Sequence, residues 1–234
     1  MGYKKRVVVL QTSFAKREDT IAYLEEHLPG VCIDYITDSS LLPEIRKAGK
    51  PTQSVIQRMT LYALAAESMG ADLILNSCST VGEVADIYSQ LVSVPVIKID
   101  DAMAHQAAKL GNNIALIATL PTTLGPSRRA IDRYGKAMGR DIKFTEFLDQ
   151  PAWDALAAGD SKRHNGILID SIRKLDKQGF DAIVMAQVSM RALLPELSDI
   201  KTPVLCSFYS GLDAVVEKVK AMCKEELESA LVNL

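Results

Sequence analysis

The feature that most constrains the fold is a strand-and-helix pattern that occurs twice in the 234 residues. Three stretches of the first half match three of the second in the same order: VVVLQTS with IALIATLPTT, ADLILNSCST with FDAIVMAQVS, and SVPVIK with KTPVLC. The offset is nearly constant, at 107 residues from Thr12 to Thr119, 109 from Asp72 to Asp181 and 108 from Pro95 to Pro203. An internal duplication explains this order and spacing. The alternative is a single doubly wound domain that repeats its own pattern.

Short apolar runs alternate with amphipathic segments, which is typical of a parallel sheet with helices on both faces. The expected strands are 6–11, 31–36, 72–76, 94–98, 113–118, 142–147, 181–186 and 203–206. The expected helices are 17–28, 52–69, 80–91, 100–110, 123–138, 162–178, 190–197 and 211–231.

The duplication predicts an α/β protein of two lobes related by a pseudo-twofold axis, each a parallel sheet flanked by helices. The first lobe is expected to comprise residues 1–98 and 207–234, and the second residues 99–206. Ligands of such sheets bind beyond the carboxyl ends of the strands. We therefore expect the active site in the cleft between the lobes.

Composition excludes several classes of function. The formal net charge is −2, with charged residues at 24%, so no basic field attracts nucleic acid or an anionic membrane. No apolar run is long enough for a signal segment or a membrane span. The four cysteines show no CxxC spacing, which argues against a zinc site or a disulfide framework and fits a reducing cytoplasm. No nucleotide-binding fingerprint occurs, and His164 is interpreted as a surface residue.

The turn NSCST at 76–80 follows an apolar strand and precedes a predicted helix. At a helix N-terminus, unpaired backbone N–H groups and the helix dipole favour a thiolate. Ser79 or Thr80 can cap this helix. Cys78 is therefore the candidate reactive residue, whereas the other three cysteines lie in apolar strands or a helix and are interpreted as core residues.

Hydroxyl residues end the matching strands of both halves. Thr12 and Ser13 follow the first strand, and TLPTT at 119–123 follows its counterpart. Hydroxyls and the N–H groups at a helix start can together hold a carboxylate. Helix capping alone is the alternative. Because the two clusters occupy matching positions and one is near the cysteine turn, we predict that they contact a ligand.

The segments NSCST, VPVIKIDDAMAHQA and IALIATLPTTL resemble the aspartate/glutamate/hydantoin racemase superfamily, and the similarity covers nearly the whole chain. The resemblance implies a duplicated α/β enzyme that needs no metal or cofactor. Racemases of this superfamily use two cysteines, one from each lobe, as opposed acid and base. It also contains maleate isomerase-like enzymes, in which the first-lobe cysteine is a nucleophile, and arylmalonate decarboxylase-like enzymes, which keep the second-lobe cysteine.

By this resemblance Cys78 takes the place of the first-lobe cysteine. The second-lobe cysteine usually stands in an LGCT-type turn, and here Gln187 occupies that place. Other residues that match carboxylate- and oxyanion-contacting positions are Asn76, Thr119, Thr122 and Thr123. Two-base racemisation needs a proton acceptor and a proton donor on opposite faces of the carbon, and an amide is neither at neutral pH. Gln187 can instead hold a carboxylate or an enolate through hydrogen bonds.

The favoured hypothesis is a cofactor-independent isomerase or lyase/decarboxylase in which Cys78 is the single thiol, as nucleophile or acid/base. Gln187, Ser189 and the hydroxyl residues would bind a small carboxylate substrate. One alternative is an amino-acid or hydantoin-type racemase or epimerase with an unusual second base, such as Ser189 or water. Another is a non-catalytic carboxylate-binding protein. The identity of the substrate and any homo-oligomer stay open, because the segments 40–52 and 149–165, expected as cleft-rim loops, carry no recognisable code.

Overall fold

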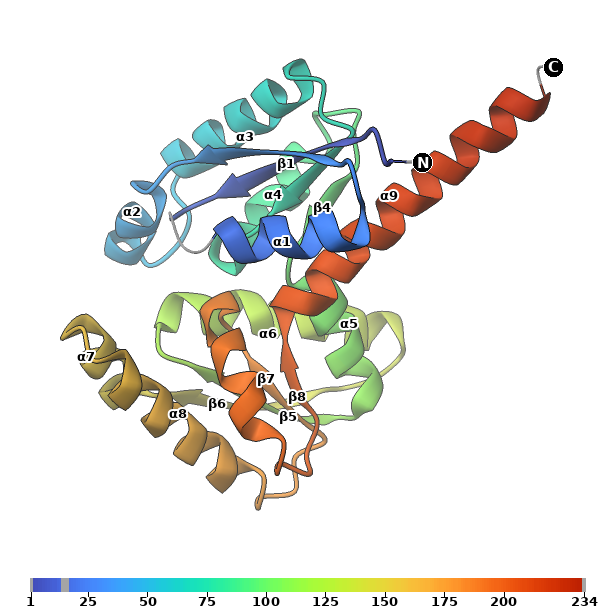
Figure 1. The fold of residues 1–234 in the computed structure, drawn as a ribbon. Coiled ribbons are helices and arrows are strands. Elements are labelled where there is room, and N and C mark those ends of the chain that lie inside the picture. Colours follow the sequence, from blue (N-terminus) through green and yellow to red (C-terminus); the bar gives the residue numbers. More distant parts are fainter. Residues whose placement is uncertain (1, 14–16, 233–234) are drawn as a thin grey trace. The chain divides into compact units, whose positions relative to one another are not determined.

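The computed structural model describes residues 2–13 and 17–232 (Figure 1). The chain forms two compact units. Unit 1 comprises the residues up to Ile99 together with those from Tyr209 onward, and unit 2 comprises Asp100–Phe208. Each unit contains a four-stranded sheet in which all neighbours are parallel, with the strand orders β2-β1-β3-β4 and β6-β5-β7-β8. The predicted fold class, two α/β lobes with parallel sheets flanked by helices, is confirmed.

The elements of unit 1 follow the chain in strand-helix alternation. They are β1 (Arg6–Gln11), α1 (Arg17–His27), β2 (Cys32–Thr37), α2 (Leu41–Ala48), α3 (Gln53–Ser68), β3 (Leu73–Asn76), the 3₁₀ turn η1 (Ser79–Val81), α4 (Gly82–Tyr88), β4 (Val96–Lys98) and the closing helix α9 (Ser207–Val232).

The elements of unit 2 repeat this order. They are α5 (Asp101–Leu110), β5 (Asn113–Ala118), α6 (Pro121–Ala137), β6 (Lys143–Leu148), α7 (Gln150–Ala157), α8 (Ser161–Leu175), β7 (Ala182–Met185), the 3₁₀ helix η2 (Val188–Leu197) and β8 (Val204–Cys206).

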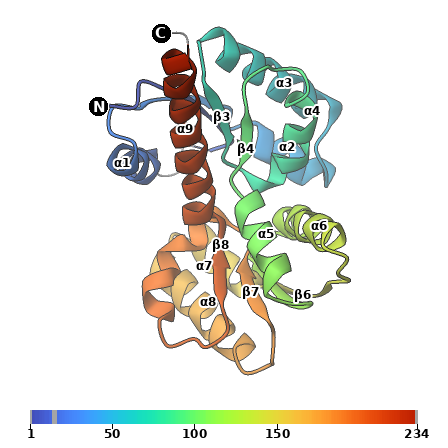
Figure 2. The ribbon, with the colours of Figure 1, turned by 90° about the vertical axis from the view of Figure 1, so that its right-hand side faces the viewer.

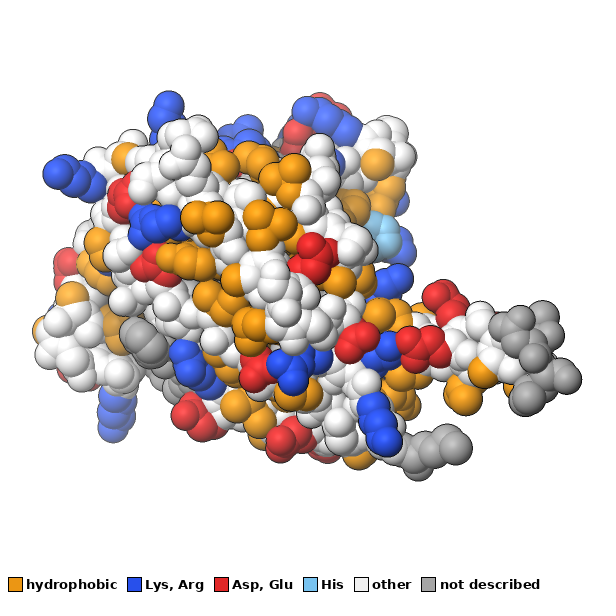
Figure 3. Space-filling view, turned by 90° about the horizontal axis from the view of Figure 1, so that it is seen from above, with side chains coloured by type: hydrophobic (Ala, Val, Ile, Leu, Met, Phe, Trp, Pro, Cys, Tyr) orange, Lys and Arg blue, Asp and Glu red, His pale blue; other side chains and the backbone are white. Residues whose placement is uncertain are grey.

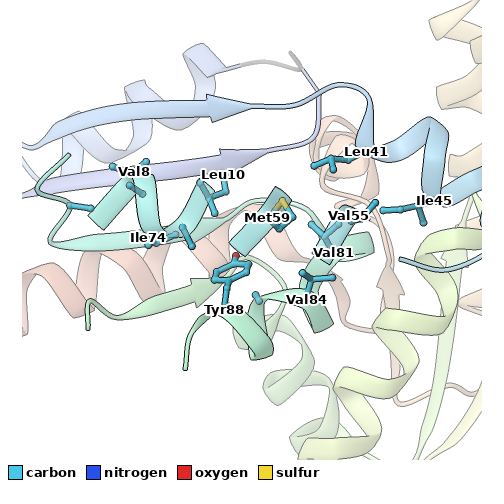
Figure 4. Packing of buried hydrophobic residues seen from close by; sticks show 14 residues of the cluster. Val8, Leu10, Leu41, Ile45, Val55, Met59, Ile74, Val81, Val84 and Tyr88 are labelled. Atoms are coloured by element: carbon cyan, nitrogen blue, oxygen red, sulfur yellow. The ribbon is translucent and has the colours of Figure 1, made fainter. Parts of the chain in front are cut away.

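Alternation along β1 divides the core of unit 1 into two layers. Val8 and Leu10 point to one face of the sheet and pack with Met59 of α3 and Tyr88 of α4 (Figure 4). Val7 and Val9 are equally buried but face the opposite side, where Figure 2 shows α1 and α9. Because the central strands are buried on both faces, they are continuous apolar runs in the sequence.

Two helices lie in segments for which the sequence predicts loops. The prediction of a loop over 40–52 is wrong because it contains α2, and the loop predicted over 149–165 is wrong where it contains α7. Each missed helix has only 8 residues and carries a proline in its first turn, Pro43 and Pro151, where a helix tolerates the missing N–H. The segment 190–197 is a 3₁₀ helix and not the expected α-helix; Pro195 inside it cannot donate a backbone hydrogen bond.

The surface mixes residue types. On the face shown in Figure 3, hydrophobic side chains gather in the middle, and basic and acidic side chains lie among and around them. Among the helices that the structure describes, none combines the length and the apolar character that crossing a membrane requires.

Candidate functional site

The carboxyl edge of the sheet in unit 1 brings together the turns that follow β1 and β3. Leu10 is opposite Asn76 in the register of these strands. One residue further, the backbone N–H and the hydroxyl of Ser77 both donate to the carbonyl of Leu10, at 3.1 and 3.0 Å. These two hydrogen bonds tie the cysteine turn to the end of β1, so that Thr12 and Cys78 lie at the same edge.

Cys78 is half-buried and packs against the hydrophobic core of unit 1. Its backbone is extended, with φ −134° and ψ 117°. Its carbonyl oxygen accepts two hydrogen bonds, from the N–H of Val81 at 3.2 Å and from Nδ2 of Asn76 at 3.0 Å. The peptide that follows the thiol is therefore held from both the turn and the interior.

Asn76 lies inside the protein and not at the surface of the site. Its side chain is 0% exposed, donates to Cys78 and accepts a hydrogen bond from the hydroxyl of Tyr88 at 3.3 Å. Tyr88 is also 0% exposed, and burial raises the pKa of its hydroxyl above the ordinary value for tyrosine. Nothing in the sequence pattern distinguishes Tyr88 from a core aromatic residue.

Four hydroxyl residues lie at this edge of the sheet, two after β1 and two in the cysteine turn: Thr12, Ser13, Ser79 and Thr80. Thr12, Ser79 and Thr80 are buried, and Ser13 is half-buried. Within residues 2–13 and 17–232, none of the four hydroxyls makes a hydrogen bond. The predicted caps are wrong, because neither η1 nor α4 receives a side-chain cap from Ser79 or Thr80. A hydroxyl group can both donate and accept a hydrogen bond.

The matching edge of unit 2 is built in the same way around Gln187. The N–H of Ala186 donates to Ile117 at 3.0 Å, and the N–H of Met190 donates to the Gln187 carbonyl at 3.0 Å. Gln187 has φ −136° and ψ 129°, close to the backbone angles of Cys78. The two turns are therefore alike in backbone and differ in side chain.

The amide of Gln187 is oriented by Thr119. Its Oε1 accepts from the backbone N–H of Thr119 at 2.6 Å and from the Thr119 hydroxyl at 3.1 Å. A backbone N–H can only donate, so it fixes which end of the amide faces Thr119. The Nε2 group, with two N–H donors, is left for other partners, and no residue in the described part of unit 2 accepts from it.

The remaining predicted residues of unit 2 differ in accessibility. Thr123 is buried and its hydroxyl donates to the carbonyl of Leu120 at 2.8 Å, whereas Thr122 is half-buried. Ser189 is exposed.

The interpretation of His164 as a surface residue is wrong: its side chain is buried, and Nδ1 contacts the carbonyl of Ala152 at 2.8 Å, which ties α8 to α7.

The described residues form no candidate metal centre. No group of three or more His, Cys, Asp or Glu side chains with suitable geometry occurs among them. Of the three other cysteines, which the sequence predicts to be core residues, Cys206 is buried, whereas Cys32 is exposed and Cys223 is half-buried, so the prediction is wrong for Cys32. Cys206, in unit 2, ends β8 and is opposite Met185 in the register. Burial raises the pKa of its thiol, which favours the protonated form.

Comparison with solved structures shows where this fold occurs. The structure resembles glutamate racemase from Francisella tularensis (TM-score 0.71, 14% identity, 94% of this chain and 82% of that one). It also resembles allantoin racemase from Klebsiella pneumoniae (TM-score 0.62, 20% identity, 94% of this chain and 89% of that one). A third similar structure is aspartate racemase from Picrophilus torridus (TM-score 0.66, 17% identity, 92% of this chain and 94% of that one). At these identities the likeness concerns the fold.

A family model assigns the chain to a family from its sequence. No curated protein matches the chain, whereas the model described as Asp/Glu/Hydantoin racemase matches residues 11–218 and so includes both turns. The chain belongs to the Asp/Glu/hydantoin racemase family.

Proposed function

We propose that this protein is a cofactor-independent enzyme that acts on a small carboxylate, with Cys78 as its one working thiol and Gln187 as a hydrogen-bond donor to the substrate. The observation that carries the proposal is the pair of matched turns. One presents a thiol beside four hydroxyls without partners in the described residues, and the other presents an amide whose oxygen is occupied by Thr119.

The chemistry follows from what each group can do. A thiolate can attack an electrophilic carbon or accept a proton. The Nε2 group of Gln187 donates hydrogen bonds and stabilises negative charge on a carboxylate or an enolate oxygen, but it cannot remove a proton. Isomerisation, carbon–carbon cleavage and decarboxylation can each proceed with one thiol and an oxyanion site, and these three reactions fit the residues best.

The hydroxyl residues have supporting roles in this proposal. Thr12, Ser13, Ser79 and Thr80 would bind the substrate around Cys78. Thr119 would orient Gln187, and Thr122 would add a donor at the start of α6. The hydroxyl of Thr123 is already bonded to Leu120, and it would serve as an acceptor only. Ser189 would contribute through its exposed hydroxyl.

Racemisation is the second candidate, favoured by the family and by the racemases that share the fold. It needs a second base, and Gln187 occupies the position where one is expected. Incubating D- and L-aspartate, D- and L-glutamate and allantoin in D₂O tests this candidate. Deuterium at the α-carbon of both enantiomers would establish racemisation, whereas exchange of one enantiomer or of neither would favour the one-thiol reactions.

A panel of small mono- and dicarboxylates tests the main proposal. Binding is measured as a rise in melting temperature, which grows with ligand concentration over Kd. Turnover is then measured by following substrate loss by NMR. Turnover that disappears in Cys78→Ser supports the enzyme. Binding without turnover, unchanged in Cys78→Ser, would instead indicate a non-catalytic carboxylate-binding protein.

Changing Gln187 to glutamate tests the role of the amide. The variant keeps an oxygen for the Thr119 N–H but replaces the two outward N–H donors with a negative oxygen, which repels a carboxylate. We expect the affinity for the best carboxylate of the panel to fall at least about tenfold, since loss of a hydrogen bond to a charged group costs about 1.5–3 kcal/mol. Isothermal titration calorimetry measures the change.

The matched control is Gln178→Glu, which adds the same charge at an exposed position of unit 2. Its affinity should stay within about twofold of the wild type, because separated surface charges are screened by salt. Equal affinities in wild type and Gln187→Glu would remove Gln187 from the proposed site.

A further inference from the structure

We propose that Asn76 and Tyr88 form a buried positioning pair for Cys78: the tyrosine orients the asparagine amide, and the amide holds the peptide that follows the thiol. This inference rests on the proposed role of Cys78. The effect of the pair on the cysteine turn does not depend on which substrate the enzyme converts.

The pair is one continuous chain of hydrogen bonds. The hydroxyl of Tyr88 donates to Oδ1 of Asn76 at 3.3 Å, and Nδ2 of Asn76 donates to the carbonyl of Cys78 at 3.0 Å. The carbonyl of Cys78 can only accept, so it fixes Nδ2 of Asn76 toward the peptide and leaves Oδ1 to accept from the Tyr88 hydroxyl. Both side chains are 0% exposed, so water does not compete for these bonds.

Unit 2 supplies an internal comparison for this turn. At a constant offset of 109 residues, Asn76 corresponds to Met185, Cys78 to Gln187, Val81 to Met190 and Tyr88 to Leu197. The turn of unit 2 has nearly the same backbone angles at its central residue, and the N–H of Met190 bonds to Gln187 as the N–H of Val81 bonds to Cys78. Both positions of the pair are apolar there, and Met185 and Leu197 are buried.

The comparison separates folding from function. A turn of this backbone forms in unit 2 without a polar pair beneath it, so the pair is not required to make the turn. Burying an amide and a phenol has a desolvation cost that an apolar pair avoids. The pair occurs in the unit that carries the thiol, and this argues that it serves the thiol.

The pair also accounts for the burial of Asn76. The family resemblance predicts that this residue contacts the substrate, but its amide is enclosed and both of its ends are bonded within unit 1. We therefore assign it a role that acts through Cys78. The second hydrogen bond to the Cys78 carbonyl, beyond the one from Val81, restrains rotation of the peptide and with it the direction of the side chain.

Two substitutions test the pair without using a substrate. Tyr88→Phe removes the hydroxyl and keeps the ring in the core, and Asn76→Met installs the residue of the matching turn. The first readout is hydrogen exchange of the Val81 amide, with the Met190 amide as the internal reference. The second is the rate of alkylation of Cys78 by iodoacetamide between pH 6 and 10, resolved by mass spectrometry of the Cys78 peptide.

In both variants we expect faster exchange at Val81, unchanged exchange at Met190 and a Cys78 alkylation profile altered by about threefold or more at neutral pH, because a typical hydrogen bond contributes about that factor or more. The matched control is Tyr62→Phe, which removes a hydroxyl bonded to Asp38 in the same unit. It should leave Val81 exchange and Cys78 alkylation at wild-type values.

Two results would overturn the proposal. One is a Val81 exchange rate and a Cys78 profile equal to the wild type in both variants, even if stability falls. The other is an identical change in Tyr62→Phe, which would reveal a general loosening of unit 1. If the variants behave as expected and no carboxylate is ever turned over, the pair stands and the proposed enzyme fails, so that the two ideas are separable.

Discussion

Replacing Cys78 with alanine is expected to reduce turnover by about a thousandfold or more, the size of effect seen when a catalytic nucleophile is removed. Neither Gln187 nor the surrounding hydroxyls can accept a proton or attack carbon at neutral pH without an activating base. The steady-state rate with the best carboxylate of the panel provides the measurement. Substrate affinity should change much less, because the hydroxyls and Gln187 remain in place.

Two further variants make this result specific. Cys32→Ala removes an exposed thiol of the same unit and should retain full activity. Cys78→Ser replaces the sulfur with a hydroxyl oxygen and raises the pKa of the nucleophile far above that of a thiol, so it should be nearly as inactive as Cys78→Ala. Activity within tenfold of the wild type in Cys78→Ala would contradict a thiol mechanism and favour a binding role.

The sequence was sufficient to predict the sheets and the turns at their edges, because these follow from local patterns. The central strands are buried on both faces, so VVVL and IALIA are continuous apolar runs that fit a parallel sheet. The repeat then placed Cys78 and Gln187 at matching strand ends, and the structure shows nearly equal backbone angles there.

The direction in which a side chain points could not be predicted from the sequence. Asn76 is a polar residue at a strand end, and nothing local indicates that its amide faces inward, since that depends on Tyr88 from the following helix. The amide of Gln187 is likewise oriented by Thr119, 68 positions away in the chain. His164 is polar and near a helix start, yet its contact with the carbonyl of Ala152 offsets the cost of burial. In each case the deciding partner is distant in sequence or specified by packing alone.

A second large effect is expected from Gly211→Ala in α9. A Cβ atom at this position would lie 2.3 Å from the carbonyl oxygen of Ile99 and 2.9 Å from its carbonyl carbon. These are backbone atoms at the end of β4, which cannot turn aside as a side chain can. We expect the free energy of unfolding to fall by about 3 kcal/mol, as for other overpacked interiors, measured by urea denaturation of the full chain.

Replacing glycine with alanine is expected to stabilise the protein where the added Cβ atom meets no other atom. Gly166 lies in α8, and apart from its own helical neighbours no described atom lies within 4 Å of an added Cβ atom. Gly166→Ala should therefore stabilise the protein by about 0.5–1 kcal/mol through helix propensity. A stabilising Gly211→Ala would show that α9 does not approach Ile99 so closely.

The consequence of Gly211→Ala extends to the cysteine turn. The N–H of Ile99 donates to the backbone carbonyl of Asn76 at 3.0 Å, so a displaced Ile99 pulls on the residue that holds Cys78. We therefore expect faster exchange of the Val81 amide in Gly211→Ala as well, at denaturant concentrations where the protein is still folded. A stability loss with unchanged Val81 exchange would confine the effect to the packing of α9 and leave the positioning pair undisturbed.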